Sequence, residues 1–280
     1  MDYMRDKDNL AAEISYNYEK FGTTNYAFMD DTLNESVEKL EYINSAIKKS
    51  GVKITFSCYM RIDLVASFPE MVDLMLDMGL VGGFLGIESM DETARKKIGK
   101  RLTNEKILRT IDAFRAKTDT LWFDAGLIIG LPGQTMASIH QTQEWLVEQN
   151  GRYFNHWMWY PLYIARYHRW LTSEFDRNYT KHGFRFVNED DIFDSRWISD
   201  ITSFDEAKQI ADDLNAASFS KKQISCWGIG HLYSHGFSFE QMSGKTQSEI
   251  DFGQAIKNKE RIVNQYKVAM RKKARLISST

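Results

Sequence analysis

The sequence predicts an α/β protein built on a parallel sheet that is either doubly wound or closed as a barrel. Strand-like and helix-like segments alternate five times at about thirty residues per unit, the size of one βαβ step. The clearest unit starts with FDAGLIIGLPGQT at 123–135, where a buried-strand pattern runs directly into a glycine-proline turn and then into a helix pattern. Ligands of such units lie at the carboxyl ends of the strands.

The first unit lacks a strand in front of its helix. The opening helix is expected to have Asp8 as its N-cap and Gly22 as its stop. A strand at 25–29 follows, and a capping-box spacing at 32–35 predicts the start of the next helix, which stops at Gly51. A barrel without that first strand needs something else to cover its open edge.

The middle of the chain repeats the pattern. Strands are predicted at 53–58 and 82–87, and the helix between them opens at Ser67–Pro69 and closes at Gly79. Asp91 begins a short charged helix, and Thr103 caps a longer one.

The last predicted strand, at 153–160, is strongly aromatic, and the regular alternation then stops. We therefore divide the chain into a barrel part, 1–165, and a mostly helical extension, 166–280, as a possible substrate or partner region. Ser203 opens a capping box for a helix that runs to about Phe219. No linker rich in Pro, Gly or Ser separates the parts, so the extension is expected to pack on the barrel.

Composition excludes some classes of function. The 280 residues are 43% hydrophobic and 26% charged with a net charge of −2, which favours a small-molecule or peptide substrate over nucleic acid. Neither a membrane span nor a signal peptide is recognisable, so a cytoplasmic protein is expected. The two cysteines, Cys58 and Cys226, cannot form a four-thiolate site.

Polar side chains gather at four predicted strand ends. A parallel barrel brings these ends to one face, and opposite charges gathered there suit a zwitterionic ligand. Glycines in the last of these segments let the backbone approach a flat ring or a ribose. The candidate residues are Asp30, Asp31, Arg61 with Asp63, Glu88, Ser89 and the turn from Gly130 to Gln134.

The order of these segments resembles the radical S-adenosylmethionine (AdoMet) enzymes, especially those with a cobalamin-type architecture. FMDDTLN is followed by ITFSCYMRIDL, then GIESMDETARKKIGK, then AGLIIGLPGQT. The resemblance covers about residues 5–165. Either GIES or GLIIGLPG alone would be a weak signal, but the ordered pair is fairly specific.

The resemblance implies a six-stranded partial (β/α) barrel in which AdoMet spans the strand ends and chelates a [4Fe-4S] cluster. An electron from the cluster splits AdoMet into methionine and a 5′-deoxyadenosyl radical, which abstracts hydrogen from the substrate. The protein's part would be binding and orientation.

By position in the family, each candidate receives an implied role. Asp30 and Asp31 would lie near the methionine end or the substrate. Arg61 and Glu88, with Ser89 beside them, would bind the methionine carboxylate and amino group or the ribose. The adenine would be lined by Ile129, Gly130 and Leu131.

The cluster motif of the family, C-x-x-x-C-x-x-C after the first strand, does not occur in this sequence. Three interpretations follow: a split enzyme whose partner chain supplies the cluster, a truncated product lacking an N-terminal segment, or a degenerate barrel that binds or scaffolds without radical chemistry. Whether the chain is an enzyme, which substrate it takes and whether cobalamin participates stay open.

Each candidate also has a purely structural interpretation. Asp31 and Ser89 would cap helices, Arg61 would form a surface ion pair with Asp63, and the glycine-proline turn would be plain turn chemistry. Cys58 is expected to be a small core residue. His231 and His235 share a helical spacing but have no third ligand nearby, so we assign no metal site. A conventional barrel hydrolase or aldolase would need a strand-end lysine or a metal set, and neither is recognisable.

Overall fold

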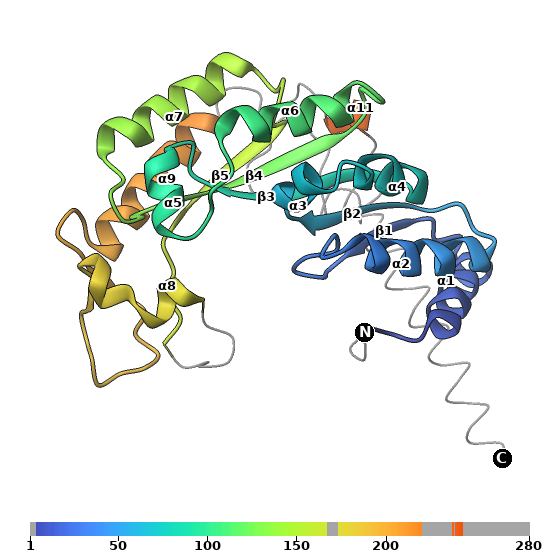
Figure 1. Cartoon of the computed structure of the whole chain (residues 1–280), viewed down its shortest axis with the longest axis horizontal. Helices are drawn as coiled ribbons and strands as arrows, with labels where there is room; N and C mark the ends of the chain where they lie inside the picture. The colour runs from blue at the N-terminus through green and yellow to red at the C-terminus, as the bar shows by residue number, and fades with distance from the viewer. Residues whose placement is uncertain (1–3, 167–172, 220–236, 238, 243–280) are drawn as a thin grey trace.

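The computed structural model describes residues 4–166, 173–219, 237 and 239–242 (Figure 1). At its centre is a five-stranded parallel sheet whose strands follow the chain order β1-β2-β3-β4-β5. The strands are β1 (Asn25–Phe28), β2 (Thr55–Met60), β3 (Leu80–Glu88), β4 (Trp122–Ile129) and β5 (His156–Pro161).

The strand order decides between the two architectures that the sequence leaves open. A doubly wound sheet reverses its strand order, whereas each strand here pairs with its neighbours in sequence. Because crossover connections are right-handed, five strands in simple succession place their helices on the same side of the sheet. The fold is therefore a partial (β/α) barrel.

Seven helices of the described residues accompany the five strands. They are α1 (Lys7–Phe21), α2 (Val37–Ser50), α3 (Ile62–Ser67), α4 (Met71–Met78), α5 (Glu92–Lys97), α6 (Asn104–Arg115) and α7 (Met136–Gln149). The predicted stops at Gly22, Gly51 and Gly79 are confirmed, since each adopts the left-handed conformation that glycine tolerates. The predicted N-caps Asp91 and Thr103 are confirmed by hydrogen bonds from their own helices.

Two predicted helix starts were wrong. The capping box at 32–35 does not open α2: these residues form a turn, and the Ser36 side chain caps the helix by accepting from the Lys39 amide. The α1 N-cap is Asp6 rather than Asp8, because the Asp6 carboxylate accepts from two amides of the first turn. Between β2 and α4 lies α3, which the sequence did not predict.

Two strands are displaced from their predicted positions. Strand β2 begins and ends two residues later than expected, and β5 begins at His156 rather than at 153. Tyr153 and Phe154 are buried, but they lie in the connection before the strand. Burial of an aromatic residue therefore did not distinguish a strand from a packed loop here.

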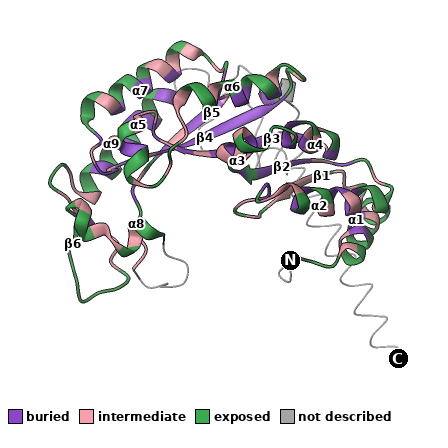
Figure 2. Ribbon diagram, viewed as in Figure 1, coloured by how far each residue is buried: buried purple, intermediate pink, exposed green. Residues whose placement is uncertain are grey.

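Strand β4 shows which face of the sheet the helices cover. Phe123 is fully buried, and its ring lies 5.4 Å from the Phe114 ring of α6, so Phe123 and its alternate neighbours up to Ile129 face the helices. Asp124, Gly126 and Ile128 face the opposite side, which we call the concave face. Figure 2 shows β4 as a buried strand in the middle of the molecule.

The C-terminal extension packs on the last strand. Helix α9 (Phe204–Phe219) confirms the predicted capping box, because the Ser203 side chain and the Glu206 carboxylate each accept from the other's backbone amide. Asn215 binds the backbone of Trp159 twice, donating to its carbonyl at 2.9 Å and accepting from its amide at 2.9 Å. A helix side chain thus occupies the hydrogen-bonding edge of β5.

The remainder of the described extension includes a short ribbon that the sequence did not predict. Its elements are α8 (Glu174–Arg177), the 3-10 helix η1 (Tyr179–His182), the antiparallel pair β6 (Arg185–Phe186) and β7 (Trp197–Ile198), and α11 (Phe239–Met242). The predicted features at Cys226, His231 and His235 lie outside the described residues. In the part of the chain that is described, no helix has the length and apolar content needed to cross a membrane.

Candidate functional site

The carboxyl ends of three successive strands each carry an ion pair. These pairs lie at the ends of β1, β2 and β3, and each contains at least one residue that the sequence predicted as a ligand-binding candidate. They are Asp30–Lys39, Arg61–Asp63 and Glu88–Lys100.

At the end of β1, Asp30 is held by a buried lysine. Its carboxylate accepts from the Lys39 ammonium at 3.0 Å and from the Thr32 amide at 2.9 Å. Lys39 also contacts Glu35, so two carboxylates share one buried cation. Asp31 is exposed. Asp30 therefore shapes the turn after β1.

At the end of β2, Arg61 forms a two-pronged pair with Asp63. Its Nε lies 3.1 Å and its Nη2 2.5 Å from the two carboxylate oxygens. Burial acts to raise the pKa of Asp63, but the hydrogen bond and charge of Arg61 outweigh it and hold the pKa below its ordinary value. The backbone of Arg61 is fixed from β1's side, since the buried Asn34 amide binds both its N–H and its C=O.

At the end of β3, Glu88 adopts a left-handed backbone conformation with φ of 65°. Its carboxylate accepts from the Lys100 ammonium at 2.6 Å, and Lys100 also donates to the Gly86 carbonyl at 2.8 Å. A Cβ on Gly86 would come within 2.8 Å of the Glu88 carboxylate. The glycine thus lets this ion pair lie close against the sheet.

Ser89 is buried and serves the start of α5. Its hydroxyl accepts from the Asp91 amide at 3.0 Å, and its carbonyl accepts from the buried Arg95 guanidinium at 2.8 Å. The N-cap itself is Asp91. Both the hydroxyl and the carbonyl of Ser89 are therefore engaged in holding the start of α5.

After β4, the glycine-proline turn is closed by Gln134. Its side-chain oxygen accepts from the amides of Gly130 at 2.9 Å and Leu131 at 3.3 Å, and its nitrogen donates to the Ile128 carbonyl at 2.9 Å. The two amides that a ligand would use are therefore already bonded within the turn.

The structure places the three predicted adenine-lining residues differently from one another. Ile129 and Leu131 are buried and line a cavity on the helix side of β4. Gly130, with φ of 97°, lies under the Trp197 ring of β7, and a Cβ there would come within 2.4 Å of it. Ile128, which the sequence analysis did not select, lies on the concave face.

The second and third strand ends are brought together. A cavity of about 380 Å³ is lined by Arg61, Asp63 and Lys100, and the charge of Lys100 also contributes to the lowered pKa of Asp63. The turn at Gly130 and Leu131 lines a different cavity. The predicted site residues therefore form two groups.

A buried polar pair lies deeper on the concave face. Asp124 accepts from the Trp122 indole at 2.6 Å and lies 3.4 Å from the His156 ring on the neighbouring strand. Both residues are almost fully buried, and neither His156 ring nitrogen has a hydrogen-bond partner in the described structure. Burial, with smaller effects from Asp124 and Tyr59, raises the pKa of Tyr160 nearby.

Sequence reasoning missed the residues that hold the candidates in place. Lys100, Lys39, Asn34 and Gln134 reach the strand ends from turns and from the following helices, so strand patterns do not reveal them. One signal was present for Lys100, because it closes the GIES segment that the sequence analysis had already singled out.

The residues present do not fit an iron-sulfur cluster. A [4Fe-4S] cluster needs several accessible thiolates, and the sequence has two cysteines in all. Cys58 lies in the middle of β2, is 5% exposed, and has a thiol whose pKa is raised by burial. We therefore derive no step through a cluster bound by these residues.

Fold and strand-end geometry together define the class of protein: a partial (β/α) barrel with ion pairs at the carboxyl ends of its first three strands. The family model for the radical SAM superfamily matches residues 1–146, more than half of the 280. The chain therefore belongs to the radical SAM superfamily, whose cofactors are AdoMet and a [4Fe-4S] cluster. The comparison with curated proteins found no match.

Solved structures with a similar fold include several radical SAM enzymes. The methyltransferase TsrM from Kitasatospora setae has 14% identity and a TM-score of 0.42, covering 56% of this chain and 29% of that one. Coproporphyrinogen III oxidase (HemN) from Escherichia coli has 12% identity and a TM-score of 0.44, and the match covers 66% of this chain and 49% of that one. The cobalamin-dependent enzyme OxsB has 17% identity and a TM-score of 0.43, and the match covers 62% of this chain and 25% of that one. The chain thus spans half or less of each of these proteins.

Proposed function

We propose that this chain binds AdoMet across the carboxyl ends of β1 to β3. The observation that carries the proposal is the succession of ion pairs there, in which Arg61 is half exposed and Glu88 partly exposed. The methionine part of AdoMet carries a carboxylate and an ammonium group. Arg61 and Lys100 suit the carboxylate and Glu88 suits the ammonium, by charge-assisted hydrogen bonds.

The internal pairs also explain how such a site stays intact without a ligand. Each charged group already has a partner, so none is left buried and uncompensated. A zwitterion can exchange with these partners and leave the total charge balance unchanged. The site is in this sense prepared for a ligand that carries both charges.

We further propose that the chain takes part in radical chemistry only together with a segment that supplies the cluster cysteines, either a partner chain or another part of the same protein. The edge position of β1 supports this proposal, because its outer side has no partner strand among the described residues. An added strand could pair there and bring a cysteine loop to the strand ends.

Calorimetric titration of AdoMet into the purified chain tests the binding proposal. We expect Glu88→Gln and Arg61→Gln each to raise the Kd about tenfold, because each removes one charge-assisted contact. Lys49→Gln is the control, since Lys49 forms an exposed ion pair with Asp8 on the α1–α2 side. Wild-type chain that fails to bind AdoMet, or variants that bind as well as wild type, would refute it.

A degenerate barrel that binds or scaffolds without radical chemistry is the second candidate. Two observations favour it: Gln134 already occupies the turn amides, and the Cys58 thiol is buried. The test of the two candidates is whether 5′-deoxyadenosine forms. The chain is reconstituted anaerobically with iron and sulfide, once alone and once with a cluster-bearing segment. Formation with that segment favours the radical enzyme, and AdoMet binding without formation in either case favours the second candidate.

A further inference from the structure

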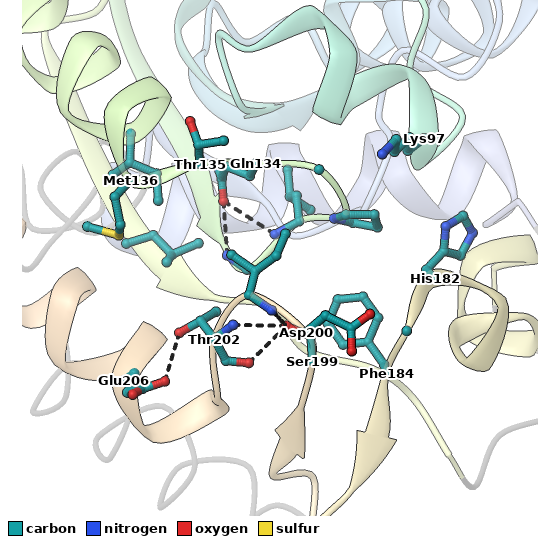
Figure 3. Close-up of a pocket in the computed structure, with 18 of the residues that line it drawn as sticks. Lys97, Gln134, Thr135, Met136, His182, Phe184, Ser199, Asp200, Thr202 and Glu206 are labelled. Carbon is teal, nitrogen blue, oxygen red and sulfur yellow. Dashed lines mark hydrogen bonds between the residues drawn. The ribbon is translucent and has the colours of Figure 1, made fainter.

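One cavity lies apart from the strand-end ion pairs. It has a volume of about 920 Å³ and lies between the turn after β4 and three segments of the C-terminal extension (Figure 3). Pockets for small ligands typically measure about 300–1,000 Å³. The contacts proposed for AdoMet at the ends of β1 to β3 do not account for this space.

One part of the cavity is apolar. Leu131 and Ile139 are buried in its wall, while Met136 and Ile201 are 42% and 58% exposed around it. Figure 3 shows Met136 on the side where α7 begins. A ligand that covers exposed apolar side chains beside a cavity removes their surface from water, which favours binding.

Another part carries charges without partners. Lys97 from α5, Lys181 from η1 and Asp200 after β7 line the cavity, and none of them forms an ion pair with another described residue. Lys97 passes directly over Gly133, where a Cβ would come within 2.5 Å of its ammonium. Figure 3 shows Lys97, His182 and Asp200 on the side away from Met136.

The remaining carboxylate of the lining is already in use. Glu206 accepts from the Ser203 amide and hydroxyl and from the Thr202 hydroxyl, and these bonds hold its pKa below the ordinary value. The charges left for a ligand are therefore two ammonium groups and one carboxylate, beside the His182 ring. This set suits a ligand with an anionic group, a cationic group and an apolar body.

We propose that the cavity binds a short peptide with free termini and apolar side chains. Its terminal carboxylate lies between Lys97 and Lys181, its terminal ammonium faces Asp200, and its side chains cover Leu131, Met136 and Ile139. A tripeptide about 10 Å long fits this size. The site is separate from the strand-end contacts proposed for AdoMet and goes beyond the proposed function.

Calorimetry on the full chain with trileucine, its C-terminal amide and its N-acetyl form tests the proposal. We expect wild type to bind trileucine about tenfold more tightly than either blocked form, because each lacks one charged contact. Lys97→Gln and Lys181→Gln should bind trileucine and its amide alike. Asp200→Asn should bind trileucine and its acetyl form alike, and Lys53→Gln, an exposed lysine elsewhere, should match wild type.

The outcomes separate this proposal from its alternatives. No binding of any of the three probes, or the same preference in every variant, would overturn it. Tighter binding of the N-acetyl form than of trileucine would identify an anionic amphiphile as the ligand and overturn the zwitterionic assignment. AdoMet titrated into the same variants should bind as in wild type. If the wild-type chain does not bind AdoMet but still discriminates among the three peptides, only the proposed function is contradicted.

Discussion

At the scale of single residues, Glu88 gives the clearest evidence of a constrained site. Residues other than glycine rarely adopt a positive φ, and they keep it where the surroundings require it. Here the Lys100 contact and the register shift in the β3–β4 pairing between Gly86 and Glu88 accompany that conformation. The backbone strain coincides with the predicted ligand contact.

Replacing Glu88 separates the backbone effect from the charge. Glu88→Gly and Glu88→Ala both remove the ion pair with Lys100, but glycine accepts the left-handed conformation without steric cost. We expect the glycine variant to be more stable than the alanine variant by about 1 kcal/mol. Urea unfolding of both measures this difference, and an alanine variant of equal or greater stability would contradict the strain.

The Arg61–Asp63 pair predicts a dependence of stability on pH. Because the native pKa of Asp63 is lowered, its ionised form stabilises the fold above the unfolded pKa of about 3.9, and this contribution is lost as the pH falls through the lower native value. The stability difference between wild type and Asp63→Asn should be constant from pH 7 to 5 and shrink below about pH 4. Urea unfolding across this range tests it, with the exposed Asp119→Asn as control. A difference that grows on acidification would exclude the pair as its source.

The position of a site residue in the chain explains whether the sequence could predict it. Asp30, Arg61 and Glu88 lie at or within two residues of the ends of β1, β2 and β3, so the sequence placed them at one edge of the sheet. Their partners were hidden, because Lys100 reaches Glu88 from twelve residues away, beyond helix α5. Long-range contacts of this kind depend on how the connecting helix packs, which a local pattern does not encode.

At the scale of elements, the turn after β4 depends on one side chain. Gln134 joins three backbone groups of the same turn and is almost fully buried. Without it, two amides and one carbonyl lose their partners in a dry environment.

Truncation of Gln134 should therefore be costly. We expect Gln134→Ala to lower the free energy of unfolding by about 2 kcal/mol, within the range for leaving buried groups unsatisfied. Gln141→Ala, on the exposed side of α7, is the matched control and should change it by less than about 0.5 kcal/mol. Equal effects of the two substitutions in urea unfolding would show that the turn does not need this side chain.

The existence of the strands and helices could be predicted better than their limits. Glycine stops and side-chain caps act locally, and this explains why Gly22, Gly51 and Thr103 were predicted correctly. The helix start predicted from the capping-box spacing at 32–35 was wrong, because Lys39 and Asn34 hold that segment as a turn. The two-residue strands β6 and β7 are too short to produce an alternating pattern.

At the scale of the whole molecule, the extension and the barrel share structure. Asn215 of α9 binds the backbone of β5, and Ser218 of the same helix accepts a hydrogen bond from Gln143 of α7. Trp197 is fully buried, donates to the Leu162 carbonyl and covers Gly130. These contacts connect residues on both sides of the predicted boundary at 165.

The barrel and the described extension should therefore unfold together. We expect a single transition by calorimetry, and Asn215→Ala should lower the stability of that transition by about 2 kcal/mol, because it leaves two backbone groups of Trp159 unbonded. Gln209→Ala, on the exposed side of the same helix, is the control. Two separate transitions, with Asn215→Ala affecting only one, would contradict this coupling.

Amide hydrogen exchange of the full chain, with and without AdoMet, tests the central claim most directly. The account predicts slower exchange after AdoMet addition in the segments at the ends of β1, β2 and β3, namely 29–36, 60–65 and 86–101, with no change at 181–184 and 199–202. Unchanged exchange at the three strand ends, or slowing confined to the segments of the extension, would contradict the assignment of AdoMet to the ion-paired edge of the sheet.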